Sequence, residues 1–218
     1  MKWQIEHMVP AHGGIQAGEV LNRCEEEDLT HFPVVEHGIL RGMVRCEDLE
    51  NFPPHTPMRE LYHLFENFYA TDDNDWTNLF SLFLANESNV LPVLDEHGLY
   101  GGVILLEDIL MDLSEIQAFT QKGELIRVQK PSEDFSFFQA AQIVETNGGK
   151  LLGILLIDEN HEGTIIELKV SGGDINQILQ SFRRYDYTIL SEHEEDTHLQ
   201  ELREHADFLH KYLKMGED

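Results

Sequence analysis

The chain has 218 residues, of which 41% are apolar, and it carries 41 acidic against 15 basic side chains, a formal net charge of −26 with neutral histidines. Such a charge argues against partners with a phosphate backbone or an anionic surface, so we expect neither nucleic-acid nor membrane binding. The apolar content excludes wholesale disorder and allows one large or two modest domains.

The two cysteines, Cys24 and Cys46, show neither a metal-type spacing nor a disulfide pattern. They are interpreted as free thiols in a reducing compartment, where a free cysteine is usually a small buried apolar residue. The first ten residues lack the apolar core of a signal peptide. The longest apolar run, around Leu151–Ile157, is far shorter than a membrane span. We therefore expect a cytoplasmic protein.

The first elements follow a helix, hairpin, helix order. A one-sided helical stripe is formed by Ala17, Val20, Leu21 and Cys24. Phe32–Val35 and Ile39–Val44 are predicted strands, joined by a tight turn at His37-Gly38. Glu47 and Asp48 are predicted to open a second helix, because carboxylates suit the unpaired N–H groups of a first turn. Prolines after that helix indicate a linker.

The same order returns in the next sixty residues. The sequence predicts a strand at Phe65–Ala70 and a turn and cap at 71–74. A helix follows with its apolar stripe at Trp76, Leu79, Phe80 and Phe83. Val90–Leu94 and Leu99–Leu106 form a second predicted hairpin, and Asp108 begins a further helix.

The two hairpins are copies of one element. LPVLDEHGLYGGVILLED at 91–108 and FPVVEHGILRGMVRCED at 32–48 share Pro-Val, His-Gly, a glycine, an apolar pair and a closing Glu-Asp. The copies are offset by 59 residues before the turn and by 60 after it. An isolated two-stranded sheet is marginal, so we expect the halves to pack together about a pseudo-twofold axis.

A different order begins after Gly123. Leu125–Val128, Leu151–Ile157, Thr164–Val170 and Tyr187–Leu190 are predicted strands, and Leu151–Ile157 is expected to be buried on both faces or nearly so. Two helical stripes lie between them. One is Phe137, Ala140, Ala141 and Val144, and the other is Ile175, Ile178, Leu179 and Phe182. The order βαββαβ is that of the split, ferredoxin-like sandwich.

Four parts are therefore predicted in an α+β chain. They are a first repeat at 1–56, a second at 57–121, a ferredoxin-like domain at 122–192 and an acidic helix at 193–218 with a coiled-coil-like apolar seam.

The repeated strand, turn, glycine and acidic helix start resemble the CBS domain, and two copies in tandem resemble a Bateman module. The segment at 124–191 resembles an ACT-like domain by its element order. The combination is similar to bacterial CBS-pair proteins of the acetoin-utilisation type. This resemblance implies a homodimer that binds an adenine nucleotide or an S-adenosyl compound between the repeats, with no required cofactor.

The resemblance also implies site residues. An Asp of the family contacts the ribose hydroxyls, and Asp48 and Asp108 match it. The family's Ser or Thr three residues earlier is replaced by Arg45, a candidate phosphate ligand, and by Leu105, which cannot bind phosphate. Thr71 and Asp72 resemble residues that line the cleft. The plain alternatives are helix-start carboxylates, a surface arginine and turn chemistry.

Three functions stay open at this point. The first is a non-enzymatic sensor of an adenosine-type ligand, accompanied by Mg²⁺ if the ligand is a free polyphosphate, because the chain is so acidic. The second is an assembly module whose nucleotide site has decayed. The third is an amino-acid sensor that uses the glycine loops at 148–149 and 172–173. No catalytic motif or metal site is expected.

Overall fold

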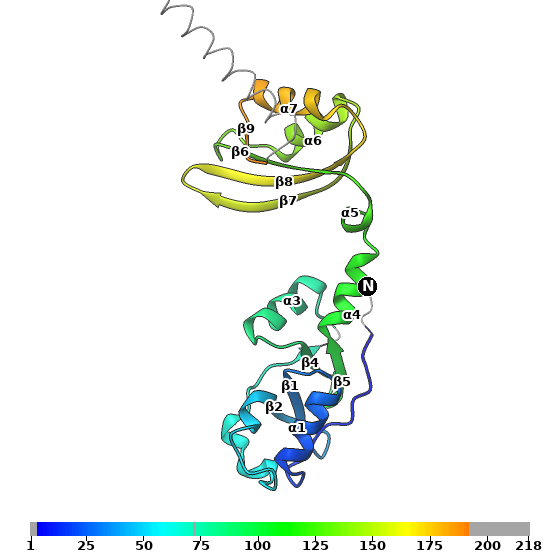
Figure 1. Ribbon diagram of the computed structural model, residues 1–218, viewed down its shortest axis with the longest axis vertical. Coiled ribbons are helices and arrows are strands. Elements are labelled where there is room, and N and C mark those ends of the chain that lie inside the picture. Colours follow the sequence, from blue (N-terminus) through cyan, green and yellow to red (C-terminus); the bar gives the residue numbers. More distant parts are fainter. Residues whose placement is uncertain (1–3, 72, 192–218) are drawn as a thin grey trace, which may run out of the picture. The chain divides into compact units, whose positions relative to one another are not determined.

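The computed structural model describes residues 4–71 and 73–191, which form helices and several small sheets (Figure 1). The predicted α+β class is confirmed. The chain divides into two compact units, the first ending at Glu115 and the second beginning at Ile116. Each has a hydrophobic core of its own.

The first unit contains the two predicted repeats. The first repeat comprises α1 (Ala17–Glu26), β1 (His31–Glu36), β2 (Ile39–Arg45) and α2 (Cys46–Leu49). Two short 3-10 turns, η1 (Met58–Glu60) and η2 (Tyr62–Leu64), lead to the second repeat. That repeat comprises β3 (Ala70–Thr71), α3 (Trp76–Ala85), β4 (Val90–Leu94), β5 (Tyr100–Leu105) and α4 (Leu106–Ser114).

The two hairpins have the same construction. β1 pairs with β2 and β4 pairs with β5, both antiparallel, and the register shifts between Val34 and Val35 in one and between Val93 and Leu94 in the other. The repeats meet at matching residues. The backbone N–H of Thr30 donates to Asn89 Oδ1 at 2.9 Å, and the backbone N–H of Asn89 donates to Thr30 Oγ1 at 3.0 Å. This reciprocal pair joins two equivalent positions, as a pseudo-twofold arrangement requires.

The segments that enter each repeat cross the hairpin of the other. Glu6 bridges to Val103 of β5, and the equivalent Glu66 bridges to Met43 of β2. The glycine shared by the two copies makes this crossing possible. Gly42 has φ +146° and Gly102 has φ +138°, and a Cβ on Gly102 would collide with the carbonyl oxygen of Glu6. The predicted strand at Phe65–Ala70 is wrong in extent, because most of that segment is a crossing chain and only Ala70–Thr71 forms β3.

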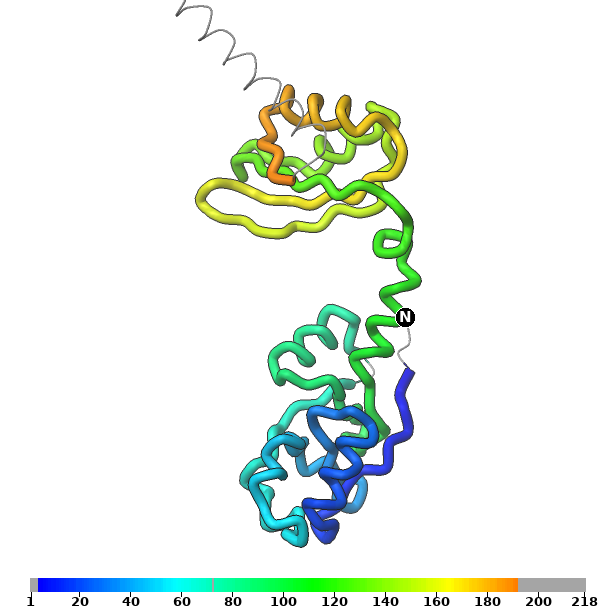
Figure 2. The backbone as a smooth tube through the Cα atoms, viewed as in Figure 1, coloured from blue at the N-terminus to red at the C-terminus, as the bar shows by residue number. Residues whose placement is uncertain are grey.

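Up to residue 191, the second unit has a four-stranded sheet with two ten-residue helices on one face (Figures 1 and 2). After the short α5 (Gln117–Thr120) come β6 (Glu124–Lys130), α6 (Phe137–Thr146), β7 (Lys150–Asn160), β8 (Gly163–Ser171), α7 (Ile175–Arg184) and β9 (Thr188–Ile189). The sheet order is β7-β8-β6-β9 with antiparallel neighbours. This is the order of a split βαββαβ sandwich, as predicted.

Two expectations for this unit are wrong. β7 is not buried on both faces, because the two helices lie on one face of the sheet (Figure 1), and Leu155, Leu156 and Ile157 are exposed. Phe137 is likewise exposed, and the buried face of α6 is made by Ala140, Ile143 and Val144. The acidic helix predicted at 193–218 lies outside the described residues.

Candidate functional site

Arg45 and Asp48, two of the predicted site residues, lie at the start of α2. Arg45 is the N-cap, and its guanidinium is engaged by acidic side chains. Nε and Nη2 donate to Glu66 Oε1 at 3.3 and 3.2 Å, and Nη1 donates to Glu87 Oε2 at 3.4 Å. Burial alone would lower the pKa of Arg45, but the two carboxylates outweigh it, and the pKa of Arg45 is raised. The candidate phosphate ligand is therefore already paired with two carboxylates.

His31 lies beneath this ion pair and is fully buried. Its Nδ1 is 2.9 Å from Thr30 Oγ1, and its Nε2 is 3.7 Å from Glu66 Oε2, too long for a hydrogen bond. Among the described residues, Nε2 has no hydrogen-bond partner. Burial lowers the pKa of His31, and Glu66 opposes that shift. His31 was not among the predicted site residues, although the repeat places it at the position of Val90, where a histidine differs from an apolar equivalent.

Asp108 occupies the equivalent of Asp48, near the start of α4. The side chain is half-buried, but its Oδ2 is inaccessible to solvent and has no hydrogen-bond partner within the described part of the chain. The preceding N-cap, Leu105, contributes no polar side chain. The second repeat therefore offers a carboxylate oxygen next to an apolar position, where the first repeat offers an ion-paired guanidinium.

Thr71 takes part in the turn before α3. Its backbone N–H and its hydroxyl both bond to Asn74 Oδ1, at 2.6 and 3.1 Å. Turn chemistry therefore accounts for this side chain. Asp72 lies outside the described residues.

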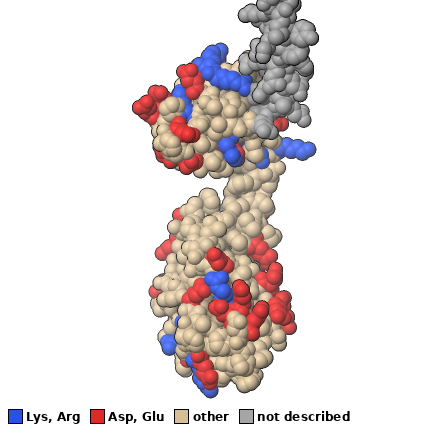
Figure 3. Space-filling model, turned by 60° about the vertical axis from the view of Figure 1, so that its left-hand side comes forward, with Lys and Arg blue, Asp and Glu red and all other residues tan. Residues whose placement is uncertain are grey.

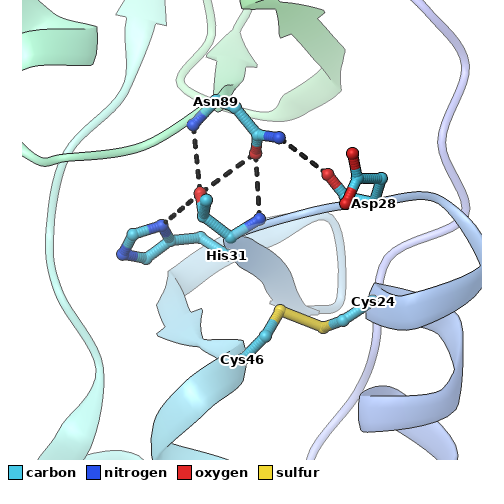
Figure 4. The surroundings of a disulfide bond; sticks show 6 residues. Cys24, Asp28, His31, Cys46 and Asn89 are labelled. Atoms are coloured by element: carbon cyan, nitrogen blue, oxygen red, sulfur yellow. Dashed lines mark hydrogen bonds between the residues drawn. A yellow bond between two sulfur atoms is a disulfide. The ribbon is translucent and has the colours of Figure 1, made fainter.

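The interpretation of two free thiols is wrong, because Cys24 and Cys46 form a disulfide (Figure 4). It joins the last turn of α1 to the first residue of α2, and both cysteines are buried. The comparison of the two repeats indicates that both cysteines lie against the core. Cys24 and Cys46 are equivalent to Phe83 and Leu106, so both occupy positions that face a core.

A cleft of about 440 Å³ opens beside the disulfide. Both cysteines and Arg45 line it, and the remaining polar lining is largely acidic, from Glu25, Asp28, Glu47, Glu50 and Glu87. Figure 3 shows how acidic side chains gather over the first unit. The cleft therefore favours neutral or cationic ligands over anionic ones.

The glycine loops of the second unit pack against each other. A Cβ on Gly173 would lie 2.7 Å from the backbone nitrogen of Gly149, so these glycines permit two backbones to meet. Gly172 and Gly173 also line a cavity of about 730 Å³, together with Lys169 and Ser171. Amino-acid binding there stays a prediction.

Across residues 4–71 and 73–191, no three His, Cys, Asp or Glu side chains are grouped to hold a metal ion. No helix in that part of the chain has the length and apolar character needed to cross a membrane.

Comparison with known proteins gives matches to solved structures alone. No protein-family model matches the sequence, and no curated protein matches it. Solved structures of CBS-domain pairs match about half of this chain. A CBS domain pair/ACT domain protein from Thermotoga maritima is 25% identical, with 53% of this chain and 98% of that chain covered and a TM-score of 0.46.

Two further matches were solved with a nucleotide. The cytosolic domain of the Mg²⁺ channel MgtE in complex with ATP is 25% identical, with 51% of this chain and 46% of that chain covered and a TM-score of 0.42. The protein CBSX2 in complex with AMP is 17% identical, with 50% and 90% covered and a TM-score of 0.42.

Proposed function

We propose that this chain is a non-enzymatic regulatory module that binds an adenosine-type ligand between its two repeats. The observation that carries the proposal is the buried, unpartnered Oδ2 of Asp108. A buried carboxylate oxygen without a partner costs free energy. Because Oδ2 is inaccessible to solvent, a ligand has to open the surroundings of Asp108, and two neighbouring hydroxyl groups would then supply the missing hydrogen bonds. Ribose is such a group.

The two repeats differ in the ligand that they suit. Leu105, at the position of Arg45, carries no charge for a phosphate, so we expect the Asp108 side to favour an uncharged or cationic adenosyl compound. In the first repeat a phosphate would compete with Glu66 and Glu87 for Arg45. A phosphorylated ligand there has to displace these carboxylates or arrive with a divalent cation such as Mg²⁺.

The predicted homodimer is part of the proposal. Apolar side chains are exposed on the helices of the second repeat, namely Trp76 and Leu84 on α3 and Leu110 and Met111 on α4. Exposed apolar residues in such number favour burial against a partner, and a second copy is the simplest one. Sedimentation of the full chain should give twice the monomer mass.

Isothermal calorimetry with AMP, ADP, ATP, NADH and S-adenosylmethionine, each with and without Mg²⁺, tests ligand binding. We expect S-adenosylmethionine or AMP to bind, and Asp108→Asn to weaken that binding at least tenfold. Glu107→Gln is the matched control, since it removes a neighbouring exposed carboxylate of α4. Failure of every compound to bind below about 1 mM, equivalent to about 4 kcal/mol, would overturn the proposal.

A second candidate is an assembly module whose nucleotide site has decayed. The ion pairs of Arg45 with Glu66 and Glu87 favour it, because they fill the position from which a phosphate would be held. This candidate predicts a dimer whose stability is the same with and without all five compounds.

A further inference from the structure

We propose that Cys24 and Cys46 form a redox modification site, and that reversible reduction of their disulfide by a dithiol releases α2. Because α2 carries Asp48 and begins after Arg45, reduction would also weaken ligand binding in the first repeat; this last consequence rests on the proposed function.

The geometry makes α2 dependent on the disulfide. α2 has four residues, and its N-cap Arg45 provides no side-chain cap. A helix of one turn is not stable alone, since nucleation costs more than its few hydrogen bonds return. Two attachments hold its first residue: the backbone N–H of Cys46 donates to the carbonyl of Thr30 at 2.9 Å, and its sulfur is bonded to Cys24.

The second repeat shows what replaces this link. Phe83 and Leu106 stand at the positions of Cys24 and Cys46, and Phe83 is buried in the core. Each following helix buries one apolar residue at the equivalent position, Leu49 on α2 and Ile109 on α4. They differ in length and in the link at the first residue: α4 has nine residues and begins at Leu106, whereas α2 has four and begins at a cysteine that is covalently bonded to α1.

The disulfide is buried from most sides but lines the cleft of about 440 Å³. A reductant thiolate that enters the cleft attacks one sulfur and forms a mixed disulfide, and the other cysteine leaves as a thiolate and takes up a proton. The second thiol of the reductant then displaces the remaining cysteine. The protein gains two electrons and two protons, and the dithiol becomes a disulfide.

Reoxidation reverses these steps with a disulfide oxidant. Nothing competes for the thiols, because the chain contains only these two cysteines. After reduction, α2 would lose its covalent link to α1 and would be held by β2, by the hydrogen bond of Cys46 to Thr30 and by the buried side chain of Leu49.

Hydrogen exchange of the unaltered 218-residue chain, in an oxidising buffer and in a buffer with a reduced dithiol, tests the proposal without any ligand. Intact mass should show the uptake of two hydrogen atoms on reduction, reversed on reoxidation. We expect the amides of Cys46 and of residues 50–52, whose N–H groups donate to the carbonyls of Thr30 and of residues 47–49, to exchange on the order of tenfold faster in the reduced protein. The amides of 107–112 on α4 are the internal control and should not change.

Two results would overturn the proposal. One is that the native protein takes up no hydrogen from a dithiol until it is unfolded, which defines a purely structural disulfide. The other is that α2 exchanges equally fast in both states. Cys24→Ala/Cys46→Ala should exchange like the reduced protein in both buffers, and because the main comparison uses the unaltered chain, the test survives if this variant fails to fold.

Ligand binding in the two redox states separates this inference from the proposed function. Weaker ligand binding by the reduced protein in the first repeat supports both. If neither state binds any nucleotide, the proposed function fails, and the exchange of α2 still decides the redox site.

Discussion

His31 shows at the scale of one residue how the first unit should respond to pH. Burial disfavours its imidazolium, so its pKa in the folded protein lies below the ordinary 6.5, with Arg45 adding to the shift and Glu66 opposing it. The unfolded chain therefore binds a proton in a range where the folded protein does not.

Stability should consequently be full above about pH 6.5 and should fall as the pH drops below it. The slope for one such group is at most about 1.4 kcal/mol per pH unit. Urea unfolding at pH 7.5, 6.5 and 5.5, followed by tryptophan emission, measures it. His31→Gln should make the free energy of unfolding depend less on pH. If this variant keeps the full slope of free energy against pH, another titrating group is responsible.

The acidic lining of the cleft predicts which thiols reduce Cys24–Cys46 fastest. The lining carboxylates Glu25, Glu47, Glu50 and Glu87 repel anions. The reacting thiolate of dithiothreitol carries one negative charge and that of glutathione a net two, so dithiothreitol should act faster. Rates are compared by trapping free thiols at fixed thiolate concentration and at two salt concentrations.

Added salt should bring the reduction rates with dithiothreitol and with glutathione closer together, because it screens the charges of these carboxylates. The double variant Glu47→Gln/Glu50→Gln should also bring the two rates closer together. If the two reductants keep the same ratio in all these conditions, the lining does not select by charge.

At the scale of the elements, Gly102 makes the crossing of Glu6 over β5 testable. Gly102→Ala places a Cβ 2.4 Å from the Glu6 carbonyl oxygen at a φ of +138°, whereas Gly101→Ala brings its Cβ no nearer than 3.7 Å to the Val93 oxygen. We expect Gly102→Ala to destabilise the first unit by about 2 kcal/mol or more, and Gly101→Ala by less than about 1 kcal/mol. Urea unfolding of both variants gives the two free energies of unfolding. If both variants lose the same free energy, the segment around Glu6 moves away from the new Cβ without destabilising the unit.

The repeat made the hairpins and the start of each following helix predictable from the sequence. Pro-Val, His-Gly and the closing Glu-Asp fix a strand, a turn and a helix start by local chemistry alone. The crossing of β5 by Glu6 and of β2 by Glu66 was not predictable in this way. A local sequence pattern does not specify which distant strand a segment will contact.

Periodicity also left the environment of β7 open. An apolar run of seven residues suits a strand covered on both faces, but the same run forms an edge strand when the neighbouring elements leave it uncovered. At the site, the resemblance made Asp48 and Asp108 predicted ligand contacts, and they stay predictions. His31 and Glu66 were not singled out, because Glu66 meets His31 and Arg45 through contacts that the sequence spacing does not specify.

At the scale of the whole molecule, the two units should respond differently to reduction. The disulfide lies within the first unit, and the second unit has no cysteine and a separate core. A disulfide that closes a loop of this length, with its cysteines 22 residues apart, stabilises by about 3 kcal/mol. For a unit of this size the corresponding loss of melting temperature is on the order of 10 °C or more.

Tryptophan emission can follow the first unit alone, because Trp3 and Trp76 both precede Glu115. Thermal unfolding monitored by this emission should move down on reduction, while hydrogen exchange of β6 and β8 should stay unchanged. Cys24→Ala/Cys46→Ala should melt at the lower temperature with and without a dithiol. A common shift of both signals would instead mean that the two units unfold as one, and no shift in either would mean that the disulfide does not constrain the unfolded chain.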